Sequence, residues 1–518
     1  MGAMKTPGVY IVEKNAFPNS VVEVATAVPA FIGYTEKADN KGKPLSNQPW
    51  RITSMAEFEN YFGKGPAPKF SFTNTAPAPV APATTAPEPS FSLPDGKGKR
   101  TNYWLTQEEG RFLLYYSMQL FYQNGGGPCY IVSVGDYSGA VEAKKLTDGI
   151  MPLVKEQEPT IVVIPDAVLL KQDECIGVEQ QMLDHCGNVM KNRVAILDVS
   201  DGYRSRQDPA GDPVNTFRDS LGINFLDFGM AYYPWLNTTI TSASNLNCEN
   251  LSDAARASLH DLLKAELDID NLPKEKAEQM TAIIDGVKHD HDWTKDAKYP
   301  QQPTDPAKKL SDSALKALQD NFVLQSKLML HKSLVALSPN YNMILTEIAN
   351  VLNLLPPAAA MAGVYTMVDD NRGVWKAPAN VSLNSVTSPA VNITHGDQED
   401  LNVTPQGKSI NAIRPFVGEG TLVWGARTLD GNSLDWRYIN VRRTMIMLEE
   451  SIRLASKAYV FEPNVANTWV TIKSMIRNFL TGVWKKGGLA GAVPDDAFAV
   501  FCGLGETMTP EDILEGVL

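Results

Sequence analysis

The sequence has few cysteines, and none lies close to another. The five, Cys129, Cys175, Cys186, Cys248 and Cys502, form no C-x-x-C pair. Isolated cysteines are typical of a reduced, cytosolic protein rather than of a disulfide scaffold. We therefore expect the protein to be stabilised by a hydrophobic core and not by cross-links.

Long runs of one chemical character are also missing. No apolar stretch is long enough to span a bilayer, and the first 32 residues lack the basic start and apolar run of a signal peptide. No long basic run occurs, and the net charge of −12 argues against nucleic-acid binding. We expect assembly in the cytoplasm, with no direct membrane insertion.

Catalytic signatures are absent as well. The chain has no G-x-S-x-G, H-E-x-x-H or phosphate-loop motif. The glycines at 125–127 follow a helical pattern and precede a strand pattern, the reverse of a phosphate loop, and so predict a turn. His289–Asp292 is either a metal site or a solvated acidic loop, and we favour the loop. His185-Cys186 is either a thiol nucleophile or a buried helix boundary, and we favour the boundary. We expect no catalytic residue, cofactor or metal.

What the sequence does contain is an ordinary globular composition. Of its 518 residues, 43% are hydrophobic and 20% are charged. These values are typical of folded proteins, and the length predicts roughly two to four domains.

The middle of the chain alternates between helical and strand patterns. We expect a helix over Thr101–Gln123. Strand candidates follow at Cys129–Val134, Ile161–Ile164, Val194–Leu197 and Phe225–Trp235. This alternation predicts a partly parallel sheet covered by helices, and the whole chain is expected to be a multidomain protein of mixed α+β and α/β class.

Composition changes along the chain suggest its domain boundaries. Proline and alanine dominate residues 65–100, and this stretch is too poor in large apolar side chains to build a core. The predicted units are an N-terminal arm with the first segment of a domain (1–64), a loop or linker (65–100), the first part of a central α/β domain (101–235), a mostly helical inserted or peripheral domain (236–335), the second part of the central domain (336–409) and a C-terminal domain (410–518).

Two helices near the C-terminus have a clear periodicity. Apolar residues follow the spacing 4, 3, 4, 3, 4 in each: Val441, Met445, Leu448, Ile452, Ala455 and Tyr459, then Val465, Trp469, Ile472, Ile476, Phe479 and Val483. Each set predicts one apolar stripe. Phe461–Asn464 separates the two helices, which we expect to pack antiparallel.

Several phrases of the sequence resemble contractile tail sheath proteins, in order along nearly the whole chain. They are residues 6–13 (TPGVYIVE), 26–36 (TAVPAFIGYTE), 58–63 (FENYFG), 121–132 (FYQNGGGPCYIV), 373–380 (GVWKAPAN), 423–429 (VWGARTL), 436–443 (WRYINVRR), 461–464 (FEPN) and Trp469. Each phrase is weakly specific alone, whereas the ordered set is specific.

The resemblance implies a structural protein and not an enzyme. Sheath subunits polymerise around an inner tube in a metastable extended state, and contraction drives the tube through a target envelope. The implied partners are further copies of this chain, an inner tube protein, and baseplate and cap proteins. An inner domain would combine residues 1–60 and 410–518. The central region of the family is often named subtilisin-like, which concerns fold alone.

Two rival interpretations come from other classes of protein. A tube or baseplate protein is one, although tube proteins are much shorter and lack the C-terminal phrases. An α/β hydrolase is the other, although no Ser/His/Asp set can be assigned. Whether the particle is a phage virion or an extracellular contractile particle stays open.

The resemblance and the helix patterns together suggest interface residues. Val9, Tyr10, Ile11 and Val12 would form an arm strand that joins a neighbouring subunit's sheet. Charged residues of the two C-terminal helices would contact the tube or another subunit: Arg442, Arg443, Glu449, Glu450, Arg453, Lys473, Arg477, Lys485 and Lys486. The alternative for these helices is a solvated face.

The end of the chain departs from the family pattern. Family members usually continue beyond the stretch that resembles residues 508–516 with about twenty further residues, including a terminal strand. We therefore expect this chain to be monomeric and deficient in assembly.

Overall fold

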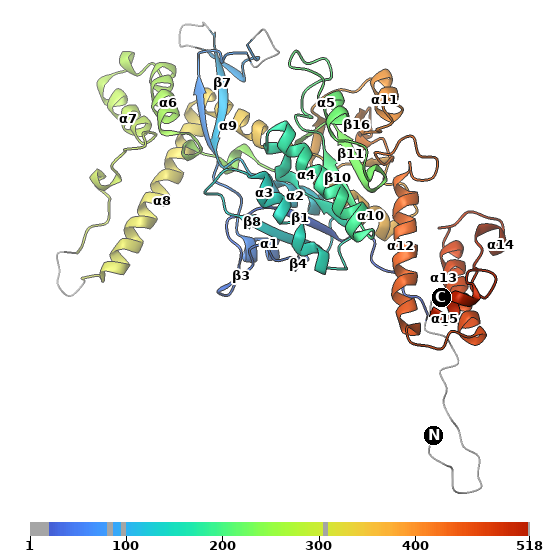
Figure 1. Cartoon of the computed structure of the whole chain (residues 1–518). Helices are drawn as coiled ribbons and strands as arrows, with labels where there is room; N and C mark the ends of the chain where they lie inside the picture. Colours follow the sequence, from blue (N-terminus) through green and yellow to red (C-terminus); the bar gives the residue numbers. More distant parts are fainter. Residues whose placement is uncertain (1–19, 80–85, 95–99, 304–308, 516–518) are drawn as a thin grey trace.

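The computed structural model describes residues 20–79, 86–94, 100–303 and 309–515. Over these residues the molecule is elongated and has three parts, seen from end to end in Figure 1. The outer lobe comprises residues 69–109 and 243–352, the central domain residues 29–62, 112–238 and 354–423, and the C-terminal lobe residues 439–515. Each part contains a cluster of buried apolar side chains.

A nine-stranded sheet forms the central domain. Its strand order is β14-β17-β16-β11-β10-β9-β1-β8-β4. The six strands from β16 to β8 pair in parallel, and β4, β17 and β14 are antiparallel at the edges. The strands are β1 (Pro29–Tyr34), β4 (Trp50–Ile52), β8 (Cys129–Gly135), β9 (Ile161–Val163), β10 (Val194–Asp198), β11 (Gly229–Tyr233), β14 (Val381–Ser382), β16 (Asn411–Phe416) and β17 (Gly420–Val423). The predicted partly parallel sheet is confirmed.

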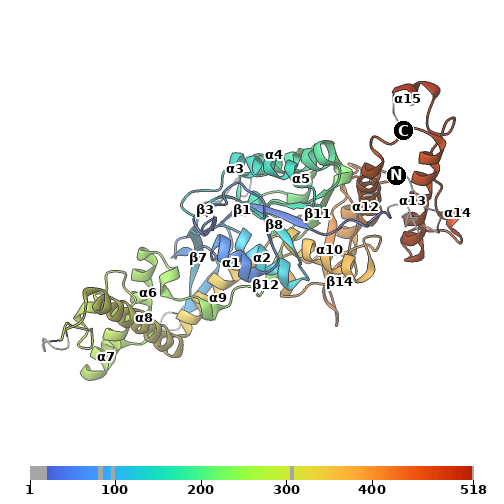
Figure 2. The ribbon, with the colours of Figure 1, turned by 90° about the horizontal axis from the view of Figure 1, so that it is seen from below.

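Helices cover both faces of this sheet. Figure 2 shows α3 (Ala143–Asp148), α4 (Gln172–Asp184) and α5 (Pro213–Ser220) on one face. On the other face lie α1 (Met55–Phe62), α2 (Leu114–Gln123) and α10 (Ala358–Arg372). A parallel strand that is covered on both faces is expected to be apolar along nearly its whole length. All residues of β1, β9, β10 and β11 are buried, and Asp198 at the end of β10 is the one charged residue among them.

Short elements complete the central domain. They are β2 (Asp39–Asn40), β3 (Lys43–Pro44), β12 (Leu236–Thr238), β13 (Leu354–Leu355), β15 (Val386–Pro389) and α11 (His395–Asn402). The strands β13, β12 and β15 form a separate small sheet, and β2 pairs with β3. These elements lie around the large sheet and add no strand to it.

The helix predicted over Thr101–Gln123 is wrong in its first half. Residues Arg100–Glu109 form strand β7, and only α2 is helical. Gly110 separates the two elements with a φ of 72°, a value that glycine adopts readily. The strand forms because β7 pairs with β5 (Lys69–Thr73) on one side and with β6 (Phe91–Pro94) on the other, partners that helical periodicity cannot reveal.

Residues 65–100 also differ from the predicted core-free loop. Phe70, Phe72, Phe91 and Leu93 are buried in the outer lobe, where they pack with α6 (Asp253–Glu266), α7 (Lys274–Asp285), α8 (Asp312–Leu337) and α9 (Pro339–Leu352). The two strands are short and alternate apolar with polar residues, so the surrounding proline and alanine dominate the composition. The outer lobe therefore combines a three-stranded sheet with the helices of residues 253–352.

The C-terminal lobe contains both predicted helices, α12 (Ile439–Ser456) and α13 (Ala466–Lys485), followed by α14 (Pro494–Ala497) and α15 (Pro510–Glu515). The resemblance implied an inner domain that joins residues 1–60 to this lobe. Instead, β1, β4 and α1 belong to the central domain, because the apolar strand β1 is buried between β8 and β9. Of the described N-terminal residues, 23–26 reach the C-terminal lobe.

Two buried carboxyl groups, Asp198 and Glu179, interact between β10 and α4. The Oδ1 atom of Asp198 accepts a hydrogen bond of 2.8 Å from the backbone N–H of Ala358, the first residue of α10. Glu179 Oε2 has no hydrogen-bond partner among the described residues. Burial raises the pKa of Asp198 to about 7. Burial, with the negative charge of Asp198, also raises the pKa of Glu179 well above its ordinary value.

We expect Asp198→Asn to stabilise the protein in alkaline solution. Because folding raises the pKa of Asp198 from 3.8 to about 7, its contribution to stability is complete below pH 4 and is lost as the pH rises to 7. The variant should exceed the native chain by roughly 2 to 4 kcal/mol in unfolding free energy at pH 8. Urea unfolding at pH 5 and pH 8, followed by tryptophan fluorescence, measures this.

The control for this experiment is Asp148→Asn, which neutralises an exposed carboxylate of the same domain. Parallel pH profiles for Asp198→Asn and the native chain would contradict the expectation.

Candidate assembly interface

A buried ion pair joins the C-terminal lobe to the rest of the molecule. Arg443 of α12 pairs with Asp369 of α10 at 2.6 Å, and both side chains are 3% exposed. The Arg443 guanidinium also donates to the backbone oxygen of Thr26 at 2.9 Å and lies 4.6 Å from the ring centre of Tyr365. Thr26 Oγ1 donates to Asp369 at 2.6 Å. Three distant segments of the chain therefore meet at one guanidinium.

Arg442, the neighbouring residue, is buried against aromatic rings. Its guanidinium carbon lies 3.7 Å from the ring centre of Phe228 and 4.5 Å from that of Trp436. Asp227 lies 3.4 Å away, and burial lowers the pKa of Arg442. Both arginines were predicted to contact a tube or another subunit, and both instead face the interior of this chain.

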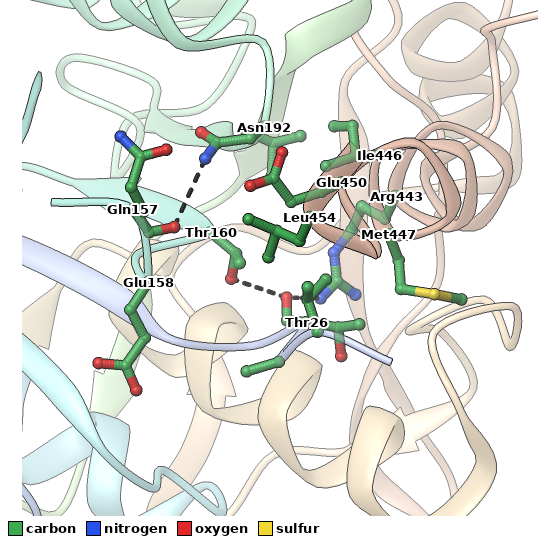
Figure 3. Close-up of a pocket in the computed structure, with 13 residues that line it drawn as sticks. Thr26, Gln157, Glu158, Thr160, Asn192, Arg443, Ile446, Met447, Glu450 and Leu454 are labelled. Atoms are coloured by element: carbon green, nitrogen blue, oxygen red, sulfur yellow. Dashed lines mark hydrogen bonds between the residues drawn. The ribbon is translucent and has the colours of Figure 1, made fainter. Parts of the chain in front are cut away.

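A cavity of about 250 Å³ lies beside this ion pair, beneath α12. Figure 3 shows Ile446, Met447 and Leu454 of α12 on one side and residues of the central domain on the other. At the edge of the cavity, Thr160 Oγ1 donates a hydrogen bond of 2.7 Å to the backbone oxygen of Thr26. The contact between α12 and the sheet is therefore tight at Arg443 and open beyond it.

The other predicted residues lie on or near the surface of the C-terminal lobe. Glu449 is exposed, and Glu450 pairs with Arg453 through a 2.7 Å hydrogen bond. On α13, Lys473 pairs with Glu506 at 2.8 Å, Arg477 pairs with Asp495, and Lys486 pairs with Glu23 at 2.7 Å. Lys485 is exposed and makes no ion pair within the described ranges. It is the most available cation of this set.

Sequence reasoning missed the exposed apolar residues of the C-terminal lobe. Phe461 is completely exposed, and the other large apolar side chains at the surface are Val441, Leu454, Val460, Val465, Val470, Val493, Phe501, Leu504 and Leu514. An apolar groove of about 580 Å³ also runs between α12 and residues 489–498. The lobe's own core cluster contains few side chains, namely Met447, Leu448, Leu480 and Val483 with Val374 of the central domain, while Ile472, Met475 and Met508 are buried outside it. The groove and the exposed side chains make the lobe a candidate interaction surface.

The four residues predicted for the arm, Val9, Tyr10, Ile11 and Val12, lie outside the described residues. The described chain begins close to the C-terminal lobe. The backbone N–H of Val24 donates to Ser451 Oγ at 3.1 Å, next to the Lys486–Glu23 pair. The segment that leads to the predicted arm is therefore attached to α12 and α13.

The two weaker chemical candidates gain no support from their surroundings. His185 and Cys186 are buried, and burial lowers the pKa of His185 to about 4 and raises that of Cys186 to about 12. A neutral thiol beside a neutral imidazole is a poor nucleophile. Near His289 the described residues contain no group of three side chains that could hold a metal ion. Across the described part of the chain, no helix has the length and apolar character required to cross a membrane.

Comparisons with known proteins identify the C-terminal lobe first. Residues 432–500 match the model of the phage tail sheath C-terminal domain. The tail sheath protein of Vibrio phage KVP40 is 27% identical over 164 residues, which cover 31% of this chain and 23% of the phage protein. A putative prophage major tail sheath protein of Pseudomonas aeruginosa is 26% identical over 141 residues, covering 27% of this chain and 36% of the relative.

The chain is related to the contractile tail sheath proteins. The tail sheath protein of Enterobacteria phage T4 is also similar, with 27% identity over 138 residues that cover 26% of this chain and 20% of that protein. The alignments thus span between a fifth and about a third of the length of these relatives. The predicted resemblance is confirmed.

Solved sheath structures share the fold over the whole chain. The sheath complex of an extracellular contractile injection system (PVC) in its contracted state has a TM-score of 0.54 and 24% identity, covering 100% of this chain and 92% of that one. A chain from the contracted anti-feeding prophage baseplate has a TM-score of 0.57 and 22% identity, covering 99% and 93%. The mixed α/β, multidomain architecture is therefore that of the sheath structures.

We expect Arg443→Met to loosen the C-terminal lobe. The change leaves Asp369 buried without its counter-charge, which costs roughly 3 to 5 kcal/mol. Replacing both residues, as Arg443→Met with Asp369→Leu, should recover part of the loss, because no unpaired charge stays buried. Hydrogen exchange of the amides of α12 and α13 measures the opening free energy.

Arg453→Met is the matched control, since it removes an exposed partner of Glu450 and should cost less than about 1 kcal/mol. Equal exchange rates in Arg443→Met and Arg453→Met would show that the buried pair has no special role.

Proposed function

We propose that the chain is a structural sheath subunit of a contractile injection apparatus. The observation that carries this proposal is the match of residues 432–500 to the tail sheath C-terminal domain. The fold supports it, because the likeness to the PVC sheath extends over 100% of this chain and is not limited to that domain.

The C-terminal lobe supports assembly into a polymer. It exposes Phe461 and Phe501 and an apolar groove, yet it buries few apolar side chains of its own. Neighbouring subunits would cover these surfaces and supply the burial that the isolated lobe lacks. In this proposal Val9–Val12 add a strand to a neighbour's sheet, where free backbone donors and acceptors are satisfied by another chain.

Ion pairing separates the charged residues into two groups. Arg442 and Arg443 stabilise the subunit internally, as their burial indicates. Glu449, Glu450, Arg453, Lys473, Arg477, Lys485 and Lys486 are the candidates for contact with the tube or a neighbouring subunit. Among the cations of this set Lys485 is the best candidate, because it has an exposed charge that no described residue neutralises.

The proposed mechanism uses interfaces as its source of free energy. Subunits would assemble around an inner tube in a metastable extended state and rearrange when a baseplate releases them. Contraction would then drive the tube through a target envelope without nucleotide hydrolysis, nucleic-acid binding or membrane insertion by this chain. In this scheme the protein is not an enzyme, it assembles in the cytoplasm, and it then becomes part of a phage virion or an extracellular particle with its baseplate and cap.

The three parts of the molecule would have separate positions in such a particle. The C-terminal lobe, with the N-terminal segment attached to it, would face the tube and hold the contacts between subunits. The outer lobe would project from the particle surface, and the central domain would connect the two. In this arrangement the outer lobe is free to vary, since it makes no contact with the tube.

Co-expression with the cognate tube and baseplate proteins tests the proposed function. Electron microscopy should show the tube surrounded by a second layer with a regular axial repeat, and this layer should contain the chain. A chain that binds neither the tube nor the baseplate would contradict the proposed function. A chain that binds them without forming a regular layer would agree with the expected deficiency in assembly.

We expect charge reversal at Lys485 and Lys486 to weaken sheath–tube co-assembly. Two exposed cations at the end of α13 become anions, which would repel the acidic groups of the tube that the cations are proposed to contact. Lys485→Glu alone is the cleaner variant, since Lys486 also pairs with Glu23. Co-sedimentation with the tube measures the effect. Lys332→Glu on the outer lobe is the matched control, and unchanged co-sedimentation of the Lys485 variant would exclude this contact.

A further inference from the structure

The central sheet has a topological switch point. In chain order its parallel strands are β1, β8, β9, β10, β11 and β16, whereas across the sheet β1 lies between β8 and β9. The chain therefore passes from β1 to β8 on one side of β1, and then crosses back to place β9 on the other side. In open α/β sheets a crevice forms where such connections diverge, at the carboxyl ends of the two strands, and ligands bind there.

A side chain of the protein itself occupies the switch point here. Asp166 follows β9 by three residues and has no exposed surface. Its Oδ2 atom accepts a hydrogen bond of 2.9 Å from the N–H of Tyr34, the last residue of β1. Its Oδ1 atom accepts one of 2.6 Å from the N–H of Leu113, the residue that precedes α2.

The backbone of β1 passes very close to the Asp166 carboxylate at Gly33. A Cβ atom on Gly33 would lie 2.5 Å from Asp166 Oδ2 and 3.0 Å from Leu114 Cβ. A glycine is therefore required at the end of β1. Glycines have the same purpose in dinucleotide-binding loops, where they let the backbone approach a phosphate.

We propose that the carboxylate of Asp166 is a built-in substitute for a bound anion. It fills the position at the switch point where sheets of related topology hold the phosphate or carboxylate of a ligand, and it uses the same donors, namely backbone N–H groups at a helix N-terminus. The site is thus an anion site for a group of carboxylate size that is permanently occupied from within the chain.

The crevice next to Asp166 agrees with this assignment. It has a volume of about 850 Å³, and Glu36, Glu108, Glu109 and one cation, Arg111, line it. The excess of negative charge repels phosphate groups, and the buried Asp166 removes the donors that would otherwise attract them. A pocket large enough for a nucleotide is therefore closed to it electrostatically.

The internal anion also connects secondary-structure elements. Asp166 ties the end of β1 to the start of α2, and α2 packs against α10, which carries Asp369 of the junction with the C-terminal lobe. Burial outweighs the hydrogen bonds and raises the pKa of Asp166 to about 6, so the group is still charged at neutral pH. The two carboxyl oxygens are the acceptors for the N–H groups of Tyr34 and Leu113.

Asp166→Gly with added formate tests the proposal on the isolated chain, independently of assembly. The variant loses the carboxylate and leaves buried donors unpaired, so its thermal midpoint should fall by roughly 10 °C. Formate, which matches the missing group, should restore more than half of this loss in a saturable manner. Chloride at the same ionic strength should not, and the native chain should respond to neither salt.

Two further variants keep the outcome decisive. Asp148→Gly, which removes an exposed carboxylate, should show no difference between formate and chloride. Asp166→Asn should be destabilised but not rescued, because its amide still fills the space. If Asp166→Gly is insoluble, its soluble yield on refolding in formate against chloride gives the same answer. A variant as stable as the native chain, or equal effects of formate and chloride, would overturn the proposal.

Discussion

The ion pair between Arg443 and Asp369 is the contact on which the placement of the C-terminal lobe against the central domain depends. It joins α12 to α10 and, through the backbone oxygen of Thr26, to the segment that precedes β1. Replacing such a pair with apolar residues can be neutral, whereas removing one member leaves a buried charge unpaired. Its main contribution is therefore the geometry that it imposes between the C-terminal lobe and the central domain, and its contribution to stability is secondary.

The central domain and the C-terminal lobe differ in how much of their apolar surface each buries within itself. The central domain buries complete strands on both faces and fills its own switch point with Asp166, and its exposed apolar side chains, such as Ile223 and Val417, lie outside the sheet. The C-terminal lobe has the opposite character, with a small core, an open groove and several exposed aromatic and aliphatic side chains. Such a subunit is well suited to polymerisation. The core of the central domain stabilises the fold, while the exposed apolar surface of the C-terminal lobe is available for contacts with other subunits.

Sequence patterns predicted what depends on local periodicity. The buried strands of the central sheet are short apolar runs, and α12 and α13 carry clear helical spacing, so both were found from the sequence. Strand and ion-pair partners that lie far away in the chain were not found from the sequence. The strand β7 needed β5 and β6, and the inward direction of Arg443 needed Asp369, 74 residues earlier. An arginine on a helix is expected to be solvated, and only the tertiary fold reveals that this one is not. The exposed state of Phe461 likewise has no local signal.

The cavity beneath α12 has a mechanical consequence. Side chains along the cavity have protein neighbours on fewer sides than Arg443 has, so they give up fewer contacts when α12 moves. The junction is therefore held most firmly at Arg443 and least firmly farther along α12, near Leu454. We expect a load on the C-terminal lobe to displace that end of α12 before it breaks the ion pair.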